Sequence, residues 1–430
     1  MLAIIVLARL AVFSSAENRF IVYPTILQER TTGSSFVLQL TDDIVLNLKK
    51  SDVLATKLLM TTSREEGSQT EEEGIVNSNL RIKPLLMANR TLRGEMLHLL
   101  YEVQEKTESF INFGSGRIWR QIFRQIAHVE IFVVELHIVS DKEHQKYFKT
   151  KEDLIAYMAV MTNAVNLRYL DMTKPKIKFM LVGVTRSLED GFAKIIDGAI
   201  IGAETLDGLI KYYKEGRIAG APDMVHLITG RDMARYEDGV LDRSYDGVSN
   251  QDTVCTKYAV GLSEDTATSF LGVAVMAHEL AHVLGAEHDN PPKCPWSEGY
   301  LMSYLDGGVK KYRLSPCTVE DIRNAVKKLP WHCTIIVALT NYMSRHKELP
   351  GQIVNADHYC RKYLKVDDER EKVYSVKTER SAKKCKMDCC HSPSFKIKIC
   401  LEANIPDGMQ CVTGKTCQRG VCGNHTYIQL

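Results

Sequence analysis

Residues 278–289 combine the side chains and the spacing that bind a catalytic metal ion. His278 and His282 are four residues apart, so on a helix they project from the same face, one turn apart. Two imidazoles placed in this way can bind one zinc ion, and Glu279 beside them can accept a proton from a bound water. Gly285 is expected to end the helix, because glycine readily adopts the left-handed conformation of a sharp helix stop. The turned chain would bring His288 back as a third ligand, which leaves the fourth position that a catalytic zinc needs.

The alternative is that His278 and His282 are surface histidines on an amphipathic helix. Gly285, His288 and Asp289 extend the zinc-binding motif beyond its five-residue core, and this favours the metal site over a chance match. A second feature agrees, because Met302 follows within Tyr300-Leu301-Met302-Ser303-Tyr304. A lone methionine is more often core filler. Its distance from the histidines favours a methionine turn beneath the metal.

At these residues the chain resembles the reprolysin (adamalysin) branch of the metzincins, a class of zinc proteases. Asp289, directly after the third histidine, separates this branch from astacin-like and matrixin-like relatives. The resemblance implies an α/β catalytic domain with a mixed sheet and a helix that carries the zinc site. It also implies structural roles for Met302, Gly285 and Asp289 around the ion.

The composition and the N-terminus are typical of a folded, secreted protein. Of the 430 residues, 45% are hydrophobic and 25% are charged, and the length suggests two to four domains. Residues 1–16 fit a signal peptide whose apolar run is too short to span a bilayer, the alternative being a buried first strand. No later run reaches spanning length, so we expect a soluble extracellular protein and a monomer. The net charge of +2 gives no reason to expect nucleic acid or a membrane surface as a partner.

All 12 cysteines lie from Cys255 onward. Their even number favours disulfides in an oxidising compartment. The glycosylation sequons at Asn89 and Asn424 agree with secretion.

Residues 17–120 have the position of a propeptide. Short strand patterns at 37–40 and 44–48 predict a β-rich segment. The segment has no cysteine, so the sequence excludes latency through a thiol bound to the zinc, and any inhibition would be steric. Residues 90–93 and 117–120 are basic processing sites by pattern.

Residues 125–335 alternate between strand and helix patterns, which is typical of an α/β sheet. The predicted strands are 129–139, 176–184, 224–228 and 258–262, and the predicted helices are 151–170, 204–213 and 266–284. This order resembles the reprolysin catalytic domain. By that resemblance, 258–262 is the antiparallel edge strand that pairs with an extended substrate.

Four cysteines in this domain allow three pairings. The resemblance implies that Cys255 pairs with Cys333 and that Cys294 pairs with Cys317, so that both bridges tie loops around the cleft.

The family resemblance also implies a structural calcium ion. Glu135 and Asp223 occupy two of its ligand positions, but Ile336 replaces an expected polar residue. Calcium is therefore an open expectation, and the alternative for Glu135 is a strand residue that faces solvent.

Residues 349–425 form a cysteine-rich tail. Eight cysteines lie between Cys360 and Cys422 with few long apolar runs, so disulfides are expected to hold this segment together. The alternative, a zinc ribbon, is disfavoured outside the cell. The segments 349–360 and 406–422 resemble the disintegrin-like module of secreted thrombospondin-motif proteases, and the short layout resembles salivary metalloproteases of ticks. Even counts of cysteines, four and eight, predict no bridge between catalytic domain and tail.

The sequence therefore predicts a secreted zinc endopeptidase that cleaves extracellular proteins, with matrix proteins or fibrin and fibrinogen as candidate substrates. One zinc ion would be held by His278, His282 and His288, with Glu279 as the general base. A non-enzymatic protein that binds through its tail is disfavoured because all three ligands and the glutamate are present. A structural zinc protein is disfavoured by the open fourth position.

Overall fold

The structure is a computed structural model. It describes residues 130–425 apart from 238, 331–332, 339 and 395–396, and eight short strands before residue 103. The predicted signal peptide, Asn89 and both basic processing sites lie outside the described residues. Among the described residues, none of the helices combines the length and the apolarity that crossing a membrane would require.

The chain forms two units, of which the first comprises residues 1–59, 69–126 and 331–340. It contains two antiparallel sheets, and the strands expected at 37–40 and 44–48 lie within β3 and β4. The first sheet has the order β1 (Arg19–Val22), β8 (His98–Glu102), β7 (Leu80–Pro84), β6 (Gly74–Ile75), and the second has the order β2 (Thr25–Glu29), β3 (Ser35–Thr41), β4 (Ile44–Lys49).

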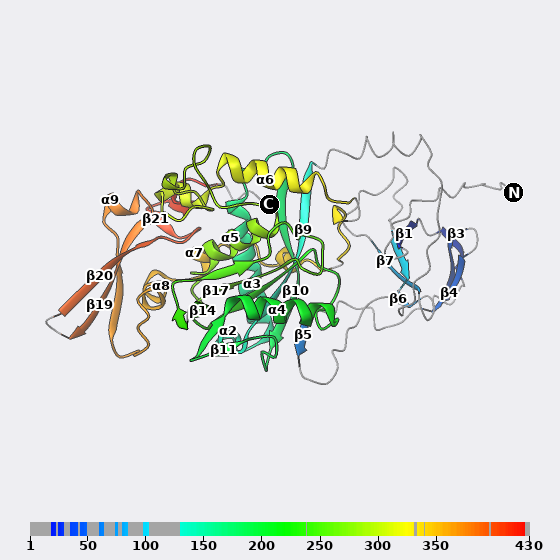
Figure 1. The fold of residues 1–430 in the computed structure, drawn as a ribbon, viewed down its shortest axis with the longest axis horizontal. Coiled ribbons are helices and arrows are strands. Elements are labelled where there is room, and N and C mark those ends of the chain that lie inside the picture. The colour runs from blue at the N-terminus through cyan, green and yellow to red at the C-terminus, as the bar shows by residue number, and fades with distance from the viewer. Residues whose placement is uncertain are drawn as a thin grey trace. The chain divides into compact units, whose positions relative to one another are not determined.

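The second unit is built on a six-stranded mixed sheet, which confirms the predicted α/β class (Figure 1). All neighbouring strands are parallel except β16 and β17. The order is β16 (Gly247–Ser249), β17 (Val260–Glu264), β13 (Met224–Thr229), β9 (Ile131–Ser140), β10 (Lys176–Ser187), β5 (Met60–Ser63). The edge strand β5 therefore comes from the stretch predicted to be a propeptide.

The prediction that residues 258–262 form the antiparallel edge strand is wrong. Those residues overlap β17, which lies inside the sheet and runs parallel to β13. The antiparallel edge is β16, where Val248 pairs with Leu262. Three residues containing a glycine and a serine carry almost no strand periodicity, so only the tertiary pairing reveals this strand.

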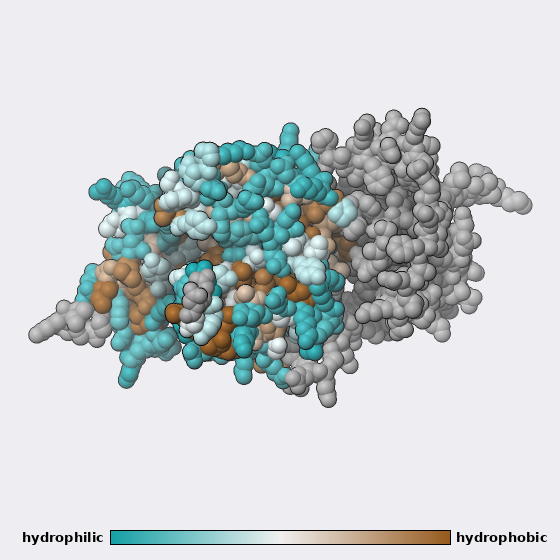
Figure 2. Space-filling view, viewed as in Figure 1, coloured by the Kyte–Doolittle hydropathy of each residue, from teal (hydrophilic) through white to brown (hydrophobic). Residues whose placement is uncertain are grey.

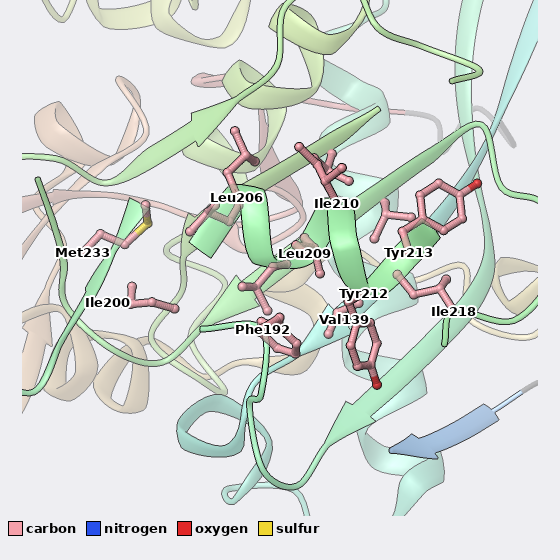
Figure 3. Packing of buried hydrophobic residues seen from close by; sticks show 14 residues of the cluster. Val139, Phe192, Ile200, Leu206, Leu209, Ile210, Tyr212, Tyr213, Ile218 and Met233 are labelled. Atoms are coloured by element: carbon pink, nitrogen blue, oxygen red, sulfur yellow. The ribbon is translucent and has the colours of Figure 1, made fainter. Parts of the chain in front are cut away.

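Helices cover both faces of the sheet. Since side chains alternate along a strand, residues such as Val139 and Leu227 face α4 (Gly202–Lys214), and this cluster is shown in Figure 3. On the other face lie α3 (Lys151–Arg168) and α5 (Val273–Val283), which contact each other.

Helix α5 begins later than the predicted residue 266. Thr268 and Phe270 have φ of +69° and +63°, which interrupts any helix at that point. The carboxylate of Asp265 then accepts a hydrogen bond from the Gly272 amide at 2.8 Å and so satisfies one free donor at the start of α5.

The remaining elements of the second unit include a separate four-stranded sheet of β11, β12, β14 and β15. They are α2 (Lys142–Gln145), β11 (Ile195–Ile196), β12 (Ala199–Ile201), β14 (Met233–Glu237), β15 (Val240–Asp242), η2 (Trp296–Glu298), η3 (Gly308–Tyr312), α6 (Pro316–Val326), η5 (Tyr342–Ser344), α7 (Pro350–Ile353) and α8 (Ala356–Tyr363).

The tail contains two small antiparallel sheets joined by disulfides. One has the order β18 (Lys372–Val376), β19 (Lys386–Ser394), β20 (Ile397–Asn404), and the other β21 (Gln410–Val412), β22 (Lys415–Gln418), β23 (Val421–Gly423), with α9 (Glu379–Ala382) between β18 and β19. The bridges are Cys360–Cys389, Cys385–Cys417, Cys390–Cys400 and Cys411–Cys422. All eight tail cysteines pair among themselves, which confirms the predicted separation and excludes a zinc ribbon.

The tail docks on the residues around α3 through buried charges. Arg168 and Asp407 form an ion pair at 2.7 Å with side chains only 6% and 3% exposed. The same carboxylate accepts from the Arg419 amide at 2.6 Å, and the Arg419 side chain pairs with Asp171. The ring of Tyr312, in η3, lies 4.7 Å from the Arg168 guanidinium. The tail is thus anchored next to the segment that follows Met302.

We predict that Asp407→Ala lowers the free energy of unfolding by about 3–5 kcal/mol, because it leaves the buried Arg168 guanidinium without its counter-charge. Urea unfolding measures the difference. The matched control is Asp368→Ala, which removes an Arg370–Asp368 pair of the same 2.7 Å length on the exposed surface and should cost nothing measurable. Equal effects from the two variants would contradict a structural role for the buried pair.

Candidate active site

Three histidine side chains converge on one point. The Nε2 atoms of His278, His282 and His288 lie 3.1–3.2 Å from one another. Three neutral imidazoles cannot all donate to each other at these distances, so the arrangement is three lone pairs aimed at a common centre. Among the described residues, this cluster has the donor set of a metal site.

The outer nitrogen of each ring is engaged. Nδ1 of His278 donates to the Leu301 carbonyl at 2.9 Å, and Nδ1 of His282 donates to the Ala286 carbonyl at 2.8 Å. Nδ1 of His288 lies 3.0 Å from the Tyr304 hydroxyl. A hydrogen on Nδ1 leaves Nε2 free to act as a ligand, so the two carbonyl acceptors select the metal-binding tautomer of His278 and His282. The Tyr304 hydroxyl orients the His288 ring.

The rings are also held neutral. Burial lowers the pKa of His278 to about 3, with a further contribution from His282. Burial also lowers the pKa values of His282 and His288. Neutral imidazole is the form that binds a metal ion, so the site is in its ligating state at neutral pH.

The turn after α5 brings His288 to the other two rings. Gly285 has φ of +96° and its amide donates to the His282 carbonyl at 2.8 Å, which ends the helix sharply. A Cβ at this position would lie 2.7 Å from that of Ala325 in α6. Both the backbone conformation and the close approach of α6 therefore require glycine here.

Asp289 and Met302 link this turn to the rest of the domain. The Asp289 amide donates to the Met302 carbonyl at 3.0 Å, and Met302 is fully buried. The Asp289 carboxylate accepts from the Ser315 hydroxyl at 2.5 Å, and that hydroxyl also caps the start of α6. Cys294 and Cys317, which the family resemblance pairs, form a disulfide between the same two segments.

Glu279 lies on α5 beside the histidines and is 5% exposed. The Ser249 hydroxyl of β16 lies 2.7 Å from its Oε2 and 3.0 Å from its main-chain oxygen. Burial raises the pKa of Glu279 to about 7, and the bond from Ser249 opposes that rise. A carboxyl group with its pKa near neutrality can both accept and return a proton.

The start of α5 is anchored by a buried polar network that sequence reasoning did not find. Asp265, which accepts from the Gly272 amide, also accepts from the Tyr157 hydroxyl at 2.6 Å and lies 3.0 Å from Nε2 of His144. These three groups come from the loop before α5, from α3 and from α2. They join distant segments, so local patterns in the sequence carry no signal for them.

The candidate calcium residues are brought together. The Glu135 amide in β9 donates to the Asp223 carboxylate at 2.8 Å, the Asp223 amide donates to the Glu135 carbonyl at 2.8 Å, and both residues are buried. The alternative that Glu135 faces solvent is wrong, since it is 2% exposed. Burial and the charge of Glu135 raise the pKa of Asp223 well above its usual value. A cation would stabilise this pair, but two carboxylates supply only part of a calcium shell, so calcium stays a proposal.

The other predicted cysteines are also bonded. Cys255 and Cys333 are each in a disulfide, and none of the 12 cysteines, all of them described, is free. Asn424 lies in an exposed position near the end of the described chain, where a glycan could be attached.

Comparison with known proteins identifies the family to which the chain belongs. The model of the reprolysin (M12B) family zinc metalloproteases matches residues 132–335. The venom metalloproteinase antarease TserMP_A of Tityus serrulatus is 30% identical over 335 residues, which cover 70% of this chain and 83% of that relative. The chain belongs to the reprolysin family.

Two further relatives extend the reprolysin comparison. The venom metalloproteinase BumaMPs1 of Olivierus martensii is 26% identical over 61% of this chain and 70% of its own length. A Bombyx mori protein described as a disintegrin and metalloproteinase with thrombospondin motifs like is 26% identical over 62% of this chain and 40% of its own length. The resemblance to tick salivary reprolysins stays a prediction.

We predict that Tyr304→Phe weakens zinc binding by about tenfold, because it removes the hydroxyl that orients His288. Competition with a chromophoric chelator measures the affinity. Tyr300→Phe removes a hydroxyl from the same turn without touching a histidine and serves as the control. Unchanged zinc affinity in Tyr304→Phe would show that the contact has no orienting effect.

Proposed function

We propose that this reprolysin is a secreted zinc endopeptidase that cleaves extracellular proteins. The observation that carries the proposal is the convergence of three Nε2 atoms whose partner nitrogens are all engaged. Sequence relatives that are venom metalloproteinases support the reaction class and an extracellular location.

The three histidines fit a zinc ion. A tetrahedral zinc with ligands at about 2.0–2.1 Å holds its nitrogen ligands roughly 3.3–3.4 Å apart. The distances of 3.1–3.2 Å are close to that value, and small rotations of the rings would close the difference. His278, His282 and His288 would be the protein ligands, with the fourth position left for water or substrate.

In this proposal, zinc supplies Lewis-acid polarisation of the scissile carbonyl and of the attacking water. The Glu279 carboxylate accepts the proton of that water and transfers it to the leaving amine. The surroundings of Glu279 suit this exchange, because burial brings its pKa to about 7.

The edge strand β16 is the element on which an extended substrate would pair. It is antiparallel to β17 and lies at the end of the sheet, so its outer main-chain groups are available for strand addition. It is also the strand that contacts Glu279. A peptide paired with β16 would therefore run past the proposed general base.

The alternative, a protein that only binds through its tail, has less support. The tail does expose Ile399 and Leu401 on β20, and Figure 2 shows small hydrophobic patches on a largely hydrophilic face. Scattered apolar residues of this kind are normal on soluble proteins. A complete set of metal-binding and proton-accepting groups at one point favours the enzyme.

Glu279→Ala is expected to reduce peptide cleavage on the order of a thousandfold or more, because the attacking water loses its proton acceptor. Zinc content should stay the same, since no ligand changes. The matched control is Glu287→Ala, which alters an exposed glutamate directly before His288 and should leave the rate unchanged. A Glu279→Ala enzyme as active as its parent would refute the assigned mechanism.

We further propose that residues 17–120 inhibit sterically, without a ligand to the metal. Since this stretch has no thiol, a mercurial should not activate the unprocessed chain, whereas cleavage near Arg120 by a basic-site convertase should. Peptide hydrolysis after each treatment tests the proposal. Full activity of the intact chain would show that the stretch is not an inhibitor.

A further inference from the structure

The face of β16 that points at α5 carries two small residues. Gly247 and Ser249 are two apart and so share one side of the strand, whereas Val248 points to the other side and packs in the α4 cluster. The strand is therefore apolar toward α4 and small or polar toward the helix that carries Glu279.

Both small residues are fitted to the Glu279 side chain. The Ser249 hydroxyl lies within hydrogen-bonding distance of Oε2 and of the Glu279 main-chain oxygen. A Cβ added at Gly247 would lie 2.7 Å from Oε1 and 2.9 Å from Cγ of Glu279, and 2.8 Å from Cγ1 of Val275 on the same helix. One residue holds the carboxylate and the other provides the space that it occupies.

A third small residue makes room for Ser249 itself. Gly261 in β17 is its cross-strand partner, and a Cβ there would lie 3.0 Å from Cβ of Ser249. Glycine at 261 therefore leaves Ser249 the space from which its hydroxyl reaches Glu279.

We infer that Ser249 is a positioning residue for Glu279, and that Gly247 shapes the space in which the carboxylate lies. The inference rests on the proposed function, in which Glu279 is the general base. Ser249 engages Oε2, whereas Oε1 lies beside Gly247.

This arrangement places substrate pairing and base positioning on the same three residues. Strand addition uses the outer main-chain groups of β16, whereas the bond to Glu279 uses a side chain that projects from its face. The two interactions therefore do not compete. A substrate that settles on β16 meets a base whose orientation is held by the strand it has joined.

The test compares Ser249→Ala and Ser249→Thr with the parent in steady-state peptide cleavage. Ser249→Ala should lower kcat on the order of tenfold with KM, zinc affinity and melting temperature close to those of the parent. Ser249→Thr keeps the hydroxyl and should restore most of kcat. The matched control is Ser244→Ala, which also removes a hydroxyl bonded to a carboxylate, that of Asp242, on an exposed segment. It should have no effect.

Gly247→Ala provides a second measurement with the hydroxyl intact. The added methyl group should displace the carboxylate and lower kcat further than Ser249→Ala does. An active parent whose Ser249→Ala variant keeps full kcat overturns the inference and leaves the proposed function standing. Parallel changes in kcat, KM and melting temperature also overturn it, since they indicate a structural role alone. A zinc-loaded parent that cleaves no peptide overturns the proposed function, and the inference fails with it.

Discussion

Three uncharged imidazole nitrogens must meet within about one hydrogen-bond length, and much of the second unit of this protein serves that constraint. Left alone, three lone pairs at 3.1–3.2 Å repel one another. They stay together because each ring is fixed from behind by Leu301, Ala286 or Tyr304. A bound metal ion would replace the repulsion between the lone pairs with three favourable metal–nitrogen bonds. A bound ion would therefore stabilise the site, and the surrounding segments hold the three rings in place.

Those segments are secured to one another by a small number of links. Asp265 holds the Gly272 amide just before α5, and Gly285 ends the helix, so both ends of α5 are fixed. Asp289 and the Cys294–Cys317 bridge attach the following loop to α6. The links use different chemistry, namely a buried carboxylate network, backbone conformation and a covalent bond. Loss of one would leave the others in place.

The tail contributes to this framework through charges that are expensive to bury. Both partners of the Arg168–Asp407 pair are needed, since either one alone would be an uncompensated buried charge that destabilises the fold. A complete buried pair adds little net stability, because the cost of desolvating both charges offsets their attraction. Because Tyr312 packs against the same arginine, the docked tail abuts the segment after Met302.

The sequence by itself determined the chemistry of this protein. The spacing of His278, Glu279, His282 and His288, the glycine between them and the clustering of cysteines all depend on neighbours within a few residues, where helical period and glycine conformation are reliable guides. It also predicted the α/β class, because strong apolar runs mark the inner strands. Only the tertiary structure decided the edge strand of the sheet and the point at which α5 begins. Strand β16 is three small residues long and exists through its pairing with β17, so the edge was assigned to the wrong strand. Helix α5 starts later than predicted because Thr268 and Phe270 adopt positive φ, which interrupts a helix there. The contacts of Ser249 with Glu279 and of Tyr304 with His288 span 30 and 16 residues of sequence. A local sequence pattern cannot predict such contacts, because they form only when distant segments pack together.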